Sequence, residues 1–304
     1  MTATVALTGG TGFVGTHVIE QGLAQGFTLR ALTRRPQPPR AGVIWIEGAL
    51  DQPASLAALA EGADTMLHVA GMTNAPDRAG FEACNVTGTA DVIAAACSAG
   101  IHRFVHVSSL AAREPALSDY GWSKARSEEV VRASGLDWTI VRPPAVYGPH
   151  DREILELFRV ARWGFVPLPP DGRLSVIAGE DLARLLLTLG RSTTGVGALY
   201  EPDDGVANGW DHRVFARAIG AAIGRRILPL SIPKTLLQLG ARADRLARGT
   251  AAKLTPDRVR YFCHPDWVVS ADARPPAALW APEVPTPEGL RATADWYRGA
   301  GLLK

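Results

Sequence analysis

Cysteine is scarce in this sequence of 304 residues, which contains only Cys84, Cys97 and Cys263. Three cysteines so widely spaced exclude a disulfide framework and a zinc site built from cysteine pairs. The histidines four residues apart, His102 and His106, flank a predicted strand, where this spacing separates them by roughly 13 Å. We therefore expect no metal site, and the lack of a disulfide framework favours a reducing compartment and a cytoplasmic protein.

Long apolar runs are also missing. No stretch approaches the roughly 20 residues that a membrane-spanning helix needs, and residues 1–7 lack the pattern of a secretory leader. We therefore expect a soluble, unprocessed protein. A strong excess of one charge is missing too, because 32 Lys and Arg oppose 30 Asp and Glu, for a net charge of +2. This balance excludes a protein whose main task is to coat nucleic acid.

The first half of the sequence contains a regular alternation of short β-branched runs and Ala- and Leu-rich helical stretches. Strands are predicted over residues 4–7, 27–33, 43–46, 65–70, 104–107 and 137–141. Helices are predicted over residues 16–24, 53–60 and 86–99. Such alternation is typical of a parallel sheet wrapped by helices. The predicted fold class is α/β, a Rossmann-type doubly wound parallel sheet with a smaller C-terminal substrate lobe.

The regular pattern ends near Gly148, beyond which prolines become frequent. We predict a dinucleotide-binding domain over residues 1–148 and a substrate lobe over residues 149–177 and 202–304. One more helical pattern and a short strand-like run come later, so residues 178–201 are expected to return to the first domain. The length agrees with two parts, because it is about twice that of a usual single domain.

A glycine-rich turn joins the first predicted strand to the first helix, with the sequence Thr8-Gly9-Gly10-Thr11-Gly12-Phe13-Val14-Gly15. In this position a dinucleotide fingerprint binds a pyrophosphate. Gly9 allows a tight turn, Gly12 lets the backbone approach the phosphates, and Gly15 permits close packing of the helix. Free N–H groups and the positive end of the helix dipole would hold the anion. The predicted cofactor contacts in this turn are Gly9, Thr11, Gly12, Phe13, Val14 and Gly15.

The end of the second predicted strand indicates which nicotinamide cofactor is preferred. An acidic residue there would accept hydrogen bonds from an unphosphorylated ribose and repel a 2′-phosphate. This sequence instead has Thr33 followed by Arg34 and Arg35, whose guanidinium groups suit a phosphate. We therefore predict NADP as the cofactor, with NAD as the less favoured alternative.

A candidate catalytic group follows the fifth predicted strand. Ser109 comes just after this strand, at the carboxyl edge of the sheet, where such folds bind ligands. Tyr120 and Lys124 lie four residues apart and share one face of a predicted helix. A nearby ammonium group and the nicotinamide charge would lower the pKa of the tyrosine, which could then act as an acid or base. Ser109 would bind the substrate oxygen, and Lys124 would also hold the nicotinamide ribose.

With these residues the chain resembles the extended short-chain dehydrogenase/reductase family, also called the NAD-dependent epimerase/dehydratase family. Further matching motifs are His68-Val69-Ala70-Gly71, Asn85-Val86-x-Gly88-Thr89, Ser108-Ser109, Arg142-Pro143-Pro144-Ala145-Val146-Tyr147-Gly148-Pro149 and Glu180-Asp181-Leu182-Ala183. The resemblance implies a catalytic triad of Ser109, Tyr120 and Lys124. It implies that the tyrosine, the lysine and ten more residues contact the cofactor: Ala49, Leu50, Val69, Ala70, Gly71, Val107, Ser108, Pro143, Ala145 and Val146. The family usually has an aspartate beside the adenine where this chain has Ala49, so we expect backbone contacts there.

The intact triad predicts an NADP-preferring oxidoreductase that transfers a hydride between nicotinamide and the carbonyl or alcohol carbon of a small, fairly apolar substrate. Small or apolar residues support this choice where the resemblance places the pocket, at Thr73, Leu110, Ala111, Ala145 and Phe165. One alternative is a nucleotide-sugar epimerase or dehydratase, for which Arg173 could reach a phosphate. Another is a non-catalytic NADPH-binding subunit or scaffold.

Positive charge is concentrated in residues 211–260, which contain 11 Lys and Arg against three Asp. Within this segment, residues 233–248 have a helical pattern of leucines interleaved with cations. The helix could pack by its leucines and leave a solvated basic face, or it could dock weakly at an anionic membrane surface. For the chain as a whole we expect a monomer or a homodimer, with a small molecule as its substrate.

Overall fold

The computed structural model describes residues 3–249 and 254–303. Its main feature is a parallel sheet in the strand order β11-β6-β5-β4-β1-β2-β3. The strands of this seven-stranded sheet are β1 Thr4–Thr8, β2 Thr28–Thr33, β3 Val43–Glu47, β4 Thr65–His68, β5 Arg103–Val107, β6 Asp137–Val141 and β11 Ala198–Tyr200. The order reverses between β1 and β4, and such a switch point opens a crevice for ligands at the carboxyl edge of the sheet.

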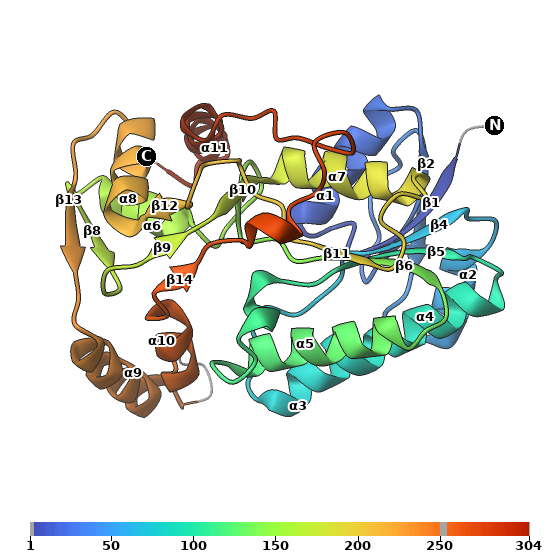
Figure 1. Ribbon diagram of the computed structural model, residues 1–304, viewed down its shortest axis with the longest axis horizontal. Coiled ribbons are helices and arrows are strands. Elements are labelled where there is room, and N and C mark those ends of the chain that lie inside the picture. Colours follow the sequence, from blue (N-terminus) through green and yellow to red (C-terminus); the bar gives the residue numbers. More distant parts are fainter. Residues whose placement is uncertain (1–2, 250–253, 304) are drawn as a thin grey trace.

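Helices cover both faces of the sheet (Figure 1). One face carries α1 (Phe13–Ala24) and α7 (Gly179–Arg191), which pack against each other. The other face carries α2 (Pro53–Ala60), α4 (Gly88–Ser98) and α5 (Asp119–Arg132). Neighbouring residues of β1 serve the two cores, since Leu7 packs with the α7 leucines and Ala6 packs with the α2 leucines. This alternation follows from the pleat of a strand.

The predicted fold class is confirmed, and most predicted elements agree with the structure to within a few residues. The strand expected over residues 65–70 ends earlier, at His68, because the N–H of Ala70 instead donates a 3.1 Å hydrogen bond to the Thr8 hydroxyl. The helix expected over residues 86–99 begins as a π-helical segment, Glu82–Thr87, and becomes α4 at Gly88.

The remaining elements form the left-hand part of the molecule in Figure 1. Its helices are α6 Leu155–Ala161, α8 His212–Ala222, α9 Lys234–Arg248, α10 Pro256–Phe262 and α11 Thr286–Gly299; its strands are β8 Phe165–Leu168, β9 Arg173–Leu174, β12 Trp210–Asp211, β13 Leu228–Ser231 and β14 Asp266–Trp267. A two-stranded sheet of β7 (Ala145–Tyr147) and β10 (Val176–Ala178) joins this part to the large sheet. The hydrophobic core of this left-hand part includes Phe158, Phe215, Ile219 and Tyr297. A short helix, α3 (Arg78–Phe81), lies below α5.

Candidate active site

The turn between β1 and α1 depends on two glycines. Gly9 has a φ of +75°, and its carbonyl oxygen accepts a 2.9 Å hydrogen bond from the N–H of Gly12. A Cβ atom on Gly9 would lie 2.7 Å from the nitrogen of Ala70, and one on Gly15 would lie 2.0 Å from the Gly9 oxygen. Only glycine can occupy these two positions, because any side chain would collide with backbone.

The start of α1 suits the pyrophosphate of a dinucleotide. Gly12 is the N-cap, and no side chain caps the helix, so its first N–H groups face the turn. Thr11 and Gly12 are exposed there, and the helix dipole adds positive potential. The residues present therefore fit the predicted cofactor, with the turn from Gly9 to Gly15 as its anion cradle.

The three residues predicted to be catalytic lie together at the carboxyl edge of the sheet. Ser109 follows the end of β5, and its side chain is hydrogen bonded to the hydroxyl of Tyr120. Tyr120 and Lys124 lie one turn apart on α5. Ser118 caps this helix by accepting a 3.0 Å hydrogen bond from the N–H of Gly121, which places Tyr120 in the first turn.

The side chain of Lys124 is buried beneath this edge. Its Nζ atom donates a 2.7 Å hydrogen bond to the carbonyl oxygen of Val107, and a Cβ on Gly71 would lie 3.5 Å from the same nitrogen. Burial lowers the pKa of Lys124 to about 8, although the Glu128 carboxylate favours the charged form. The ammonium group is thus close to its point of neutralisation near physiological pH.

The protein side chains alone do not lower the pKa of Tyr120 as the sequence predicted. Burial raises this pKa above its usual value, and the hydrogen bond with Ser109 acts only partly against the increase. The Glu153 carboxylate also raises it. Lys124 does not lower the pKa of Tyr120 as expected. Its ammonium group instead donates a hydrogen bond to the carbonyl oxygen of Val107.

Asn85 ties the segment after β4 to the catalytic helix. Its Oδ1 atom accepts a 2.7 Å hydrogen bond from the N–H of Met72, and its Nδ2 atom donates a 2.9 Å hydrogen bond to the hydroxyl of Ser123. Ser123 follows Tyr120 by less than one turn of α5. The π-helical segment brings the Asn85 side chain into place.

An ionic network connects helix α5 to the ends of strands β5 and β6. Glu128 accepts 2.7 Å hydrogen bonds from the Nε and Nη2 atoms of Arg142 and a 2.6 Å hydrogen bond from the Ser108 hydroxyl. Arg142 also pairs with Glu201 at 3.4 Å. The Ser108 hydroxyl is therefore directed into this network, which leaves the backbone of Ser108 as its means of contacting a cofactor.

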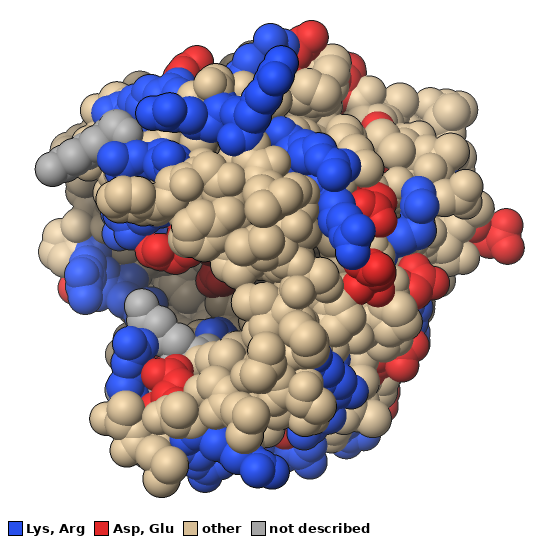
Figure 2. Space-filling view, turned by 90° about the vertical axis from the view of Figure 1, so that its left-hand side faces the viewer, with Lys and Arg blue, Asp and Glu red and all other residues tan. Residues whose placement is uncertain are grey.

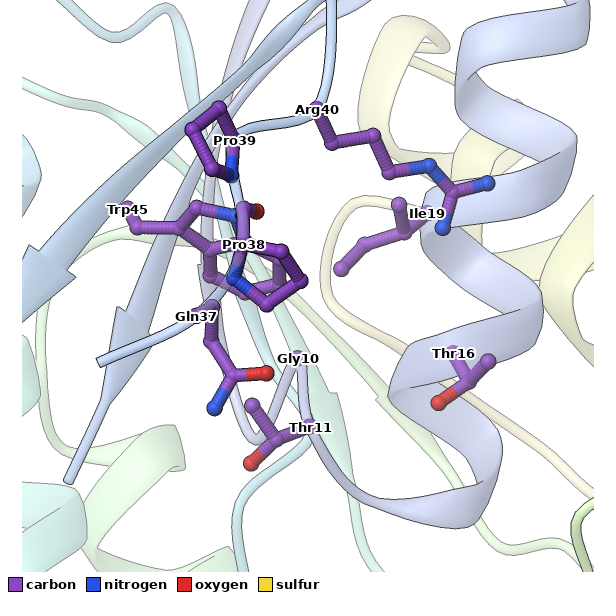
Figure 3. A pocket seen from close by; sticks show the side chains of 9 residues that line it. All are labelled: Gly10, Thr11, Thr16, Ile19, Gln37, Pro38, Pro39, Arg40 and Trp45. Carbon is purple, nitrogen blue, oxygen red and sulfur yellow. The ribbon is translucent and has the colours of Figure 1, made fainter. Parts of the chain in front are cut away.

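A surface pocket of about 310 Å³ lies beside the glycine turn (Figure 3). It is lined by Gly10, Thr11, Thr16, Ile19, Gln37, Pro38, Pro39, Arg40 and Trp45. The predicted Arg34 and Arg35 are exposed in the same loop. The positive charge of Arg34 acts to lower the pKa of the Cys84 thiol, against the larger effect of burial, which raises it. Gln37 and Arg40 were missed by the sequence interpretation, although the proline-rich run around them marked a loop beside the predicted ribose site.

The other predicted cofactor contacts follow the strand ends, as a nucleotide lying along this edge requires. Ala49 and Leu50 come just after β3, Val69 to Gly71 follow β4, and Val107 ends β5. Pro143 lies beyond β6 and accepts a 2.9 Å hydrogen bond from the N–H of Leu110. Ala145 and Val146 belong to β7, where Ala145 is exposed.

The second part of the molecule packs apolar residues against Leu110, the residue after Ser109. Leu110, Trp267 and Val269 form a buried cluster, against which Tyr261 of α10 is packed. Burial raises the pKa of Tyr261, and the nearby Tyr120 hydroxyl raises it further. No local pattern pointed to this pair, because the two residues belong to elements far apart along the chain.

Two residues suggested for the substrate pocket lie elsewhere or have other partners. Phe165 is exposed on β8, where it pairs with Leu228 of β13. The guanidinium of Arg173 donates hydrogen bonds to the carbonyl oxygens of Asn208 at 2.6 Å and Gly209 at 3.0 Å. Part of its hydrogen-bonding capacity is thus used within the lobe, which weakens its suggested role as a phosphate ligand.

Residues 3–249 and 254–303 lack two other kinds of site. No group of three or more His, Cys, Asp or Glu side chains is arranged to hold a metal ion there. No helix in the same ranges is both long and apolar enough to cross a bilayer.

Comparisons with known proteins agree with this geometry. Residues 9–157 match the family model described as NAD(P)H-binding. The chain is 37% identical to a ceramide reductase of Caulobacter vibrioides, with 98% of this chain and 96% of the relative covered. It is 28% identical to a 2-alkyl-3-oxoalkanoate reductase of Stenotrophomonas maltophilia, with 94% and 97% covered. The fold matches a crystal structure of UDP-N-acetylglucosamine 4-epimerase from Bacillus cereus, with a TM-score of 0.73, 18% identity and coverage of 98% and 97%.

A doubly wound parallel sheet with this glycine turn and this Ser-Tyr-Lys group defines an NAD(P)-dependent oxidoreductase. The chain belongs to the extended short-chain dehydrogenase/reductase family.

Proposed function

We propose that this protein is an NADP-preferring reductase that acts on a ketone group of a long-chain lipid of the ceramide type. The observation that carries the reductase chemistry is the placement of Ser109, Tyr120 and buried Lys124 together at the carboxyl edge of the sheet, with Lys124 bound to the end of β5. Bound NADPH would supply the hydride. Ser109 and Tyr120 would bind the carbonyl oxygen, and the tyrosine would donate the proton that this oxygen gains.

The positions of Arg34, Arg35 and Arg40 support the preference for NADP. All three are exposed in the loop that follows β2, and Arg40 lines the pocket beside Thr11 (Figure 3). A 2′-phosphate bound there would be close to several guanidinium groups, which bind phosphate oxygens in pairs. No acidic residue follows β2 before Arg40, so nothing in this loop would repel that phosphate.

The apolar cluster beside Ser109 and the relatives support a lipid substrate. Leu110 and Trp267 are buried in this cluster and Tyr261 packs against it, so the neighbourhood of Ser109 on this side is apolar. The names of both reductases at full-length coverage refer to molecules with alkyl chains. A nucleotide sugar would instead need cations for its diphosphate, and the cation suggested for that purpose, Arg173, is bound to backbone carbonyls.

The test is a substrate panel followed by NADPH absorbance. Three substrates would be compared. The first is a ceramide that carries a ketone group in its sphingoid chain, presented in detergent micelles; the second is a short soluble ketone, and the third is UDP-glucose. We expect NADPH to be consumed in proportion to the lipid alcohol formed, with a much lower KM for the long-chain ketone. Conversion of UDP-glucose without net NADPH consumption would instead establish an epimerase, and tight NADPH binding without any turnover would establish a binding subunit.

A further inference from the structure

Large apolar side chains are exposed on one part of this molecule. In the described residues, Ile44 and Val196 are the exposed large apolar residues of the sheet part, and the others belong to the second part, from Trp163 to Phe262. Helix α9 contributes three of them, Leu236, Leu239 and Leu246, with exposed fractions of 56%, 57% and 89%. A soluble helix usually buries such residues, so α9 presents an unusual surface.

The apolar face of α9 points away from the protein. Leu236, Leu239 and Leu246 are spaced three and seven residues apart, which puts them on one side of the helix. A different side, which includes the buried Ala241 and half-buried Leu237, faces the body of the lobe, where α9 packs against α10. The exposed leucines are therefore not the residues that attach the helix to the fold.

Arg242 adjoins this exposed face, and other cations lie further round the helix. Lys234, Arg242 and Arg245 are all exposed on α9, whereas Arg248 is paired with Asp244 at 3.2 Å. Figure 2 looks onto this side of the molecule, where α9 lies at the bottom, and shows Lys and Arg along the lower edge of a mostly tan surface.

Exposed apolar side chains also occur on the ribbon of two strands that precedes α9. β13 leads directly into α9 and pairs with β8. Leu228 and Leu230 of β13 and Phe165 of β8 are exposed, with fractions of 61%, 42% and 40%. The helix and the ribbon thus both present exposed apolar side chains, and the helix adds positive charge.

We propose that the surface formed by α9 and the β8–β13 ribbon docks on an anionic lipid bilayer. Cations beside exposed leucines match both layers of such a membrane, since the headgroups are negative and the acyl chains begin just below them. Three leucines on a short helix favour shallow, reversible binding in the plane of the interface over insertion.

Docking by α9 would place the bilayer close to the catalytic edge. α9 packs on α10, and α10 carries Tyr261, which lies near enough to Tyr120 for that residue to raise its pKa. A lipid could then move from the bilayer into the site over a short distance. This last step rests on the proposed function, whereas docking itself does not.

The test of docking is sedimentation of the full-length protein with vesicles. Vesicles of phosphatidylcholine with added phosphatidylglycerol would be compared with vesicles of phosphatidylcholine alone, at low and high salt. We expect binding to the anionic vesicles at low salt that weakens at least severalfold at high salt, because salt screens the cations. Absence of binding to anionic vesicles at low salt would overturn the proposal.

Two double variants separate the apolar and the charged contributions. Leu236→Ser with Leu239→Ser, and Arg242→Glu with Arg245→Glu, should each weaken vesicle binding by about tenfold or more. Their matched controls are Ile44→Ser with Val196→Ser, and Arg126→Glu with Arg291→Glu, which change exposed residues elsewhere and should leave binding unchanged. Equal effects of the α9 variants and their controls would contradict the proposal.

Two further measurements distinguish docking from dimerisation and from a loss of the native fold. Light scattering would show whether the wild-type protein forms a dimer that the leucine variant dissociates, and that result would assign the surface to a second copy of the chain and overturn docking. NADPH binding and melting temperature should be the same for all variants, because the substituted side chains are exposed. Vesicle binding can be measured even if no lipid ketone is reduced, so failure of docking and failure of the proposed function are distinguishable.

Discussion

The Nζ atom of Lys124 lies 2.7 Å from the carbonyl oxygen of Val107, the last residue of β5. This hydrogen bond attaches the catalytic helix α5 to the strand end beside which the nicotinamide is expected. It also keeps the ammonium group buried, and burial lowers the pKa of Lys124 to about 8. The charge of this lysine is therefore sensitive to small changes of pH above neutrality.

We expect the affinity for NADPH to fall as the pH rises through about 8. Below that pH the lysine is charged and can donate strong hydrogen bonds to the ribose hydroxyls, and above it the charge is lost. Fluorescence titration of NADPH at several pH values measures the effect. In Lys124→Met the affinity should be lower and should not change near pH 8, so an unaltered pH dependence in this variant would disprove the assignment.

Replacement of Tyr120 by Phe should reduce turnover by about 10²- to 10⁴-fold, because the group that donates the proton is removed. The dissociation constant for NADPH should remain within about threefold of the wild-type value. The matched control is Tyr261→Phe, which removes the hydroxyl of the nearby tyrosine and should leave kcat within a few-fold. Similar losses in the two variants would show that Tyr120 has no special role.

Replacement of Arg34 and Arg40 by Ser should weaken NADPH binding by about 10- to 100-fold. NADH binding should hardly change, because NADH lacks the 2′-phosphate that these guanidinium groups would contact. The two dissociation constants are measured by fluorescence titration. Arg291→Ser, at an exposed position on α11, serves as the control, and a parallel loss for both cofactors would refute a 2′-phosphate site.

Replacement of Glu128 by Ala should lower the free energy of unfolding by about 3 kcal/mol or more, because it leaves the buried Arg142 guanidinium without its main partner. Urea denaturation measures this change. The neighbouring Glu129 is exposed and pairs only with exposed Arg126, so Glu129→Ala should cost about 0.5 kcal/mol or less. Equal costs at the two positions would argue against the buried network.

The stability of the protein should decrease in mild acid because His68 and His106 are buried and neutral. Burial lowers the pKa of His68 to about 3 and places that of His106 well below its usual value. Between these values and about pH 6.5, the unfolded chain binds protons that the folded chain does not, so the free energy of unfolding falls as pH decreases. Each histidine contributes about 1.4 kcal/mol per pH unit. His106→Gln should remove one such contribution from the slope, and an identical slope would contradict this origin.

The sheet and the shared position of Ser109, Tyr120 and Lys124 at its edge could be predicted because both depend on local patterns. Runs of β-branched residues and the spacing of Gly9, Gly12 and Gly15 define a strand, a turn and a helix within a short stretch of chain. Tyr120 and Lys124 share a helix face, and Ser109 follows a strand that must end at the same edge. The sequence alone thus indicated the fold class and the predicted catalytic residues.

Other features depend on which distant elements pack together. The pair of Tyr120 and Tyr261, the diversion of Arg173 to backbone carbonyls and the position of Phe165 on an outer ribbon all arise from such contacts. The higher pKa of Tyr120 also follows from burial, which spacing does not reveal.

The α/β architecture, the glycine turn and the position of the three candidate catalytic residues follow from the sequence, because short-range periodicity specifies strands, helices and their shared faces. What covers each face depends on tertiary packing. The leucine pattern of α9 was compatible with a packed or an exposed helix, and the structure turns Leu236, Leu239 and Leu246 outward. An amphipathic pattern indicates that the two faces of a helix differ in polarity, but only the tertiary packing shows which face is buried against the rest of the protein.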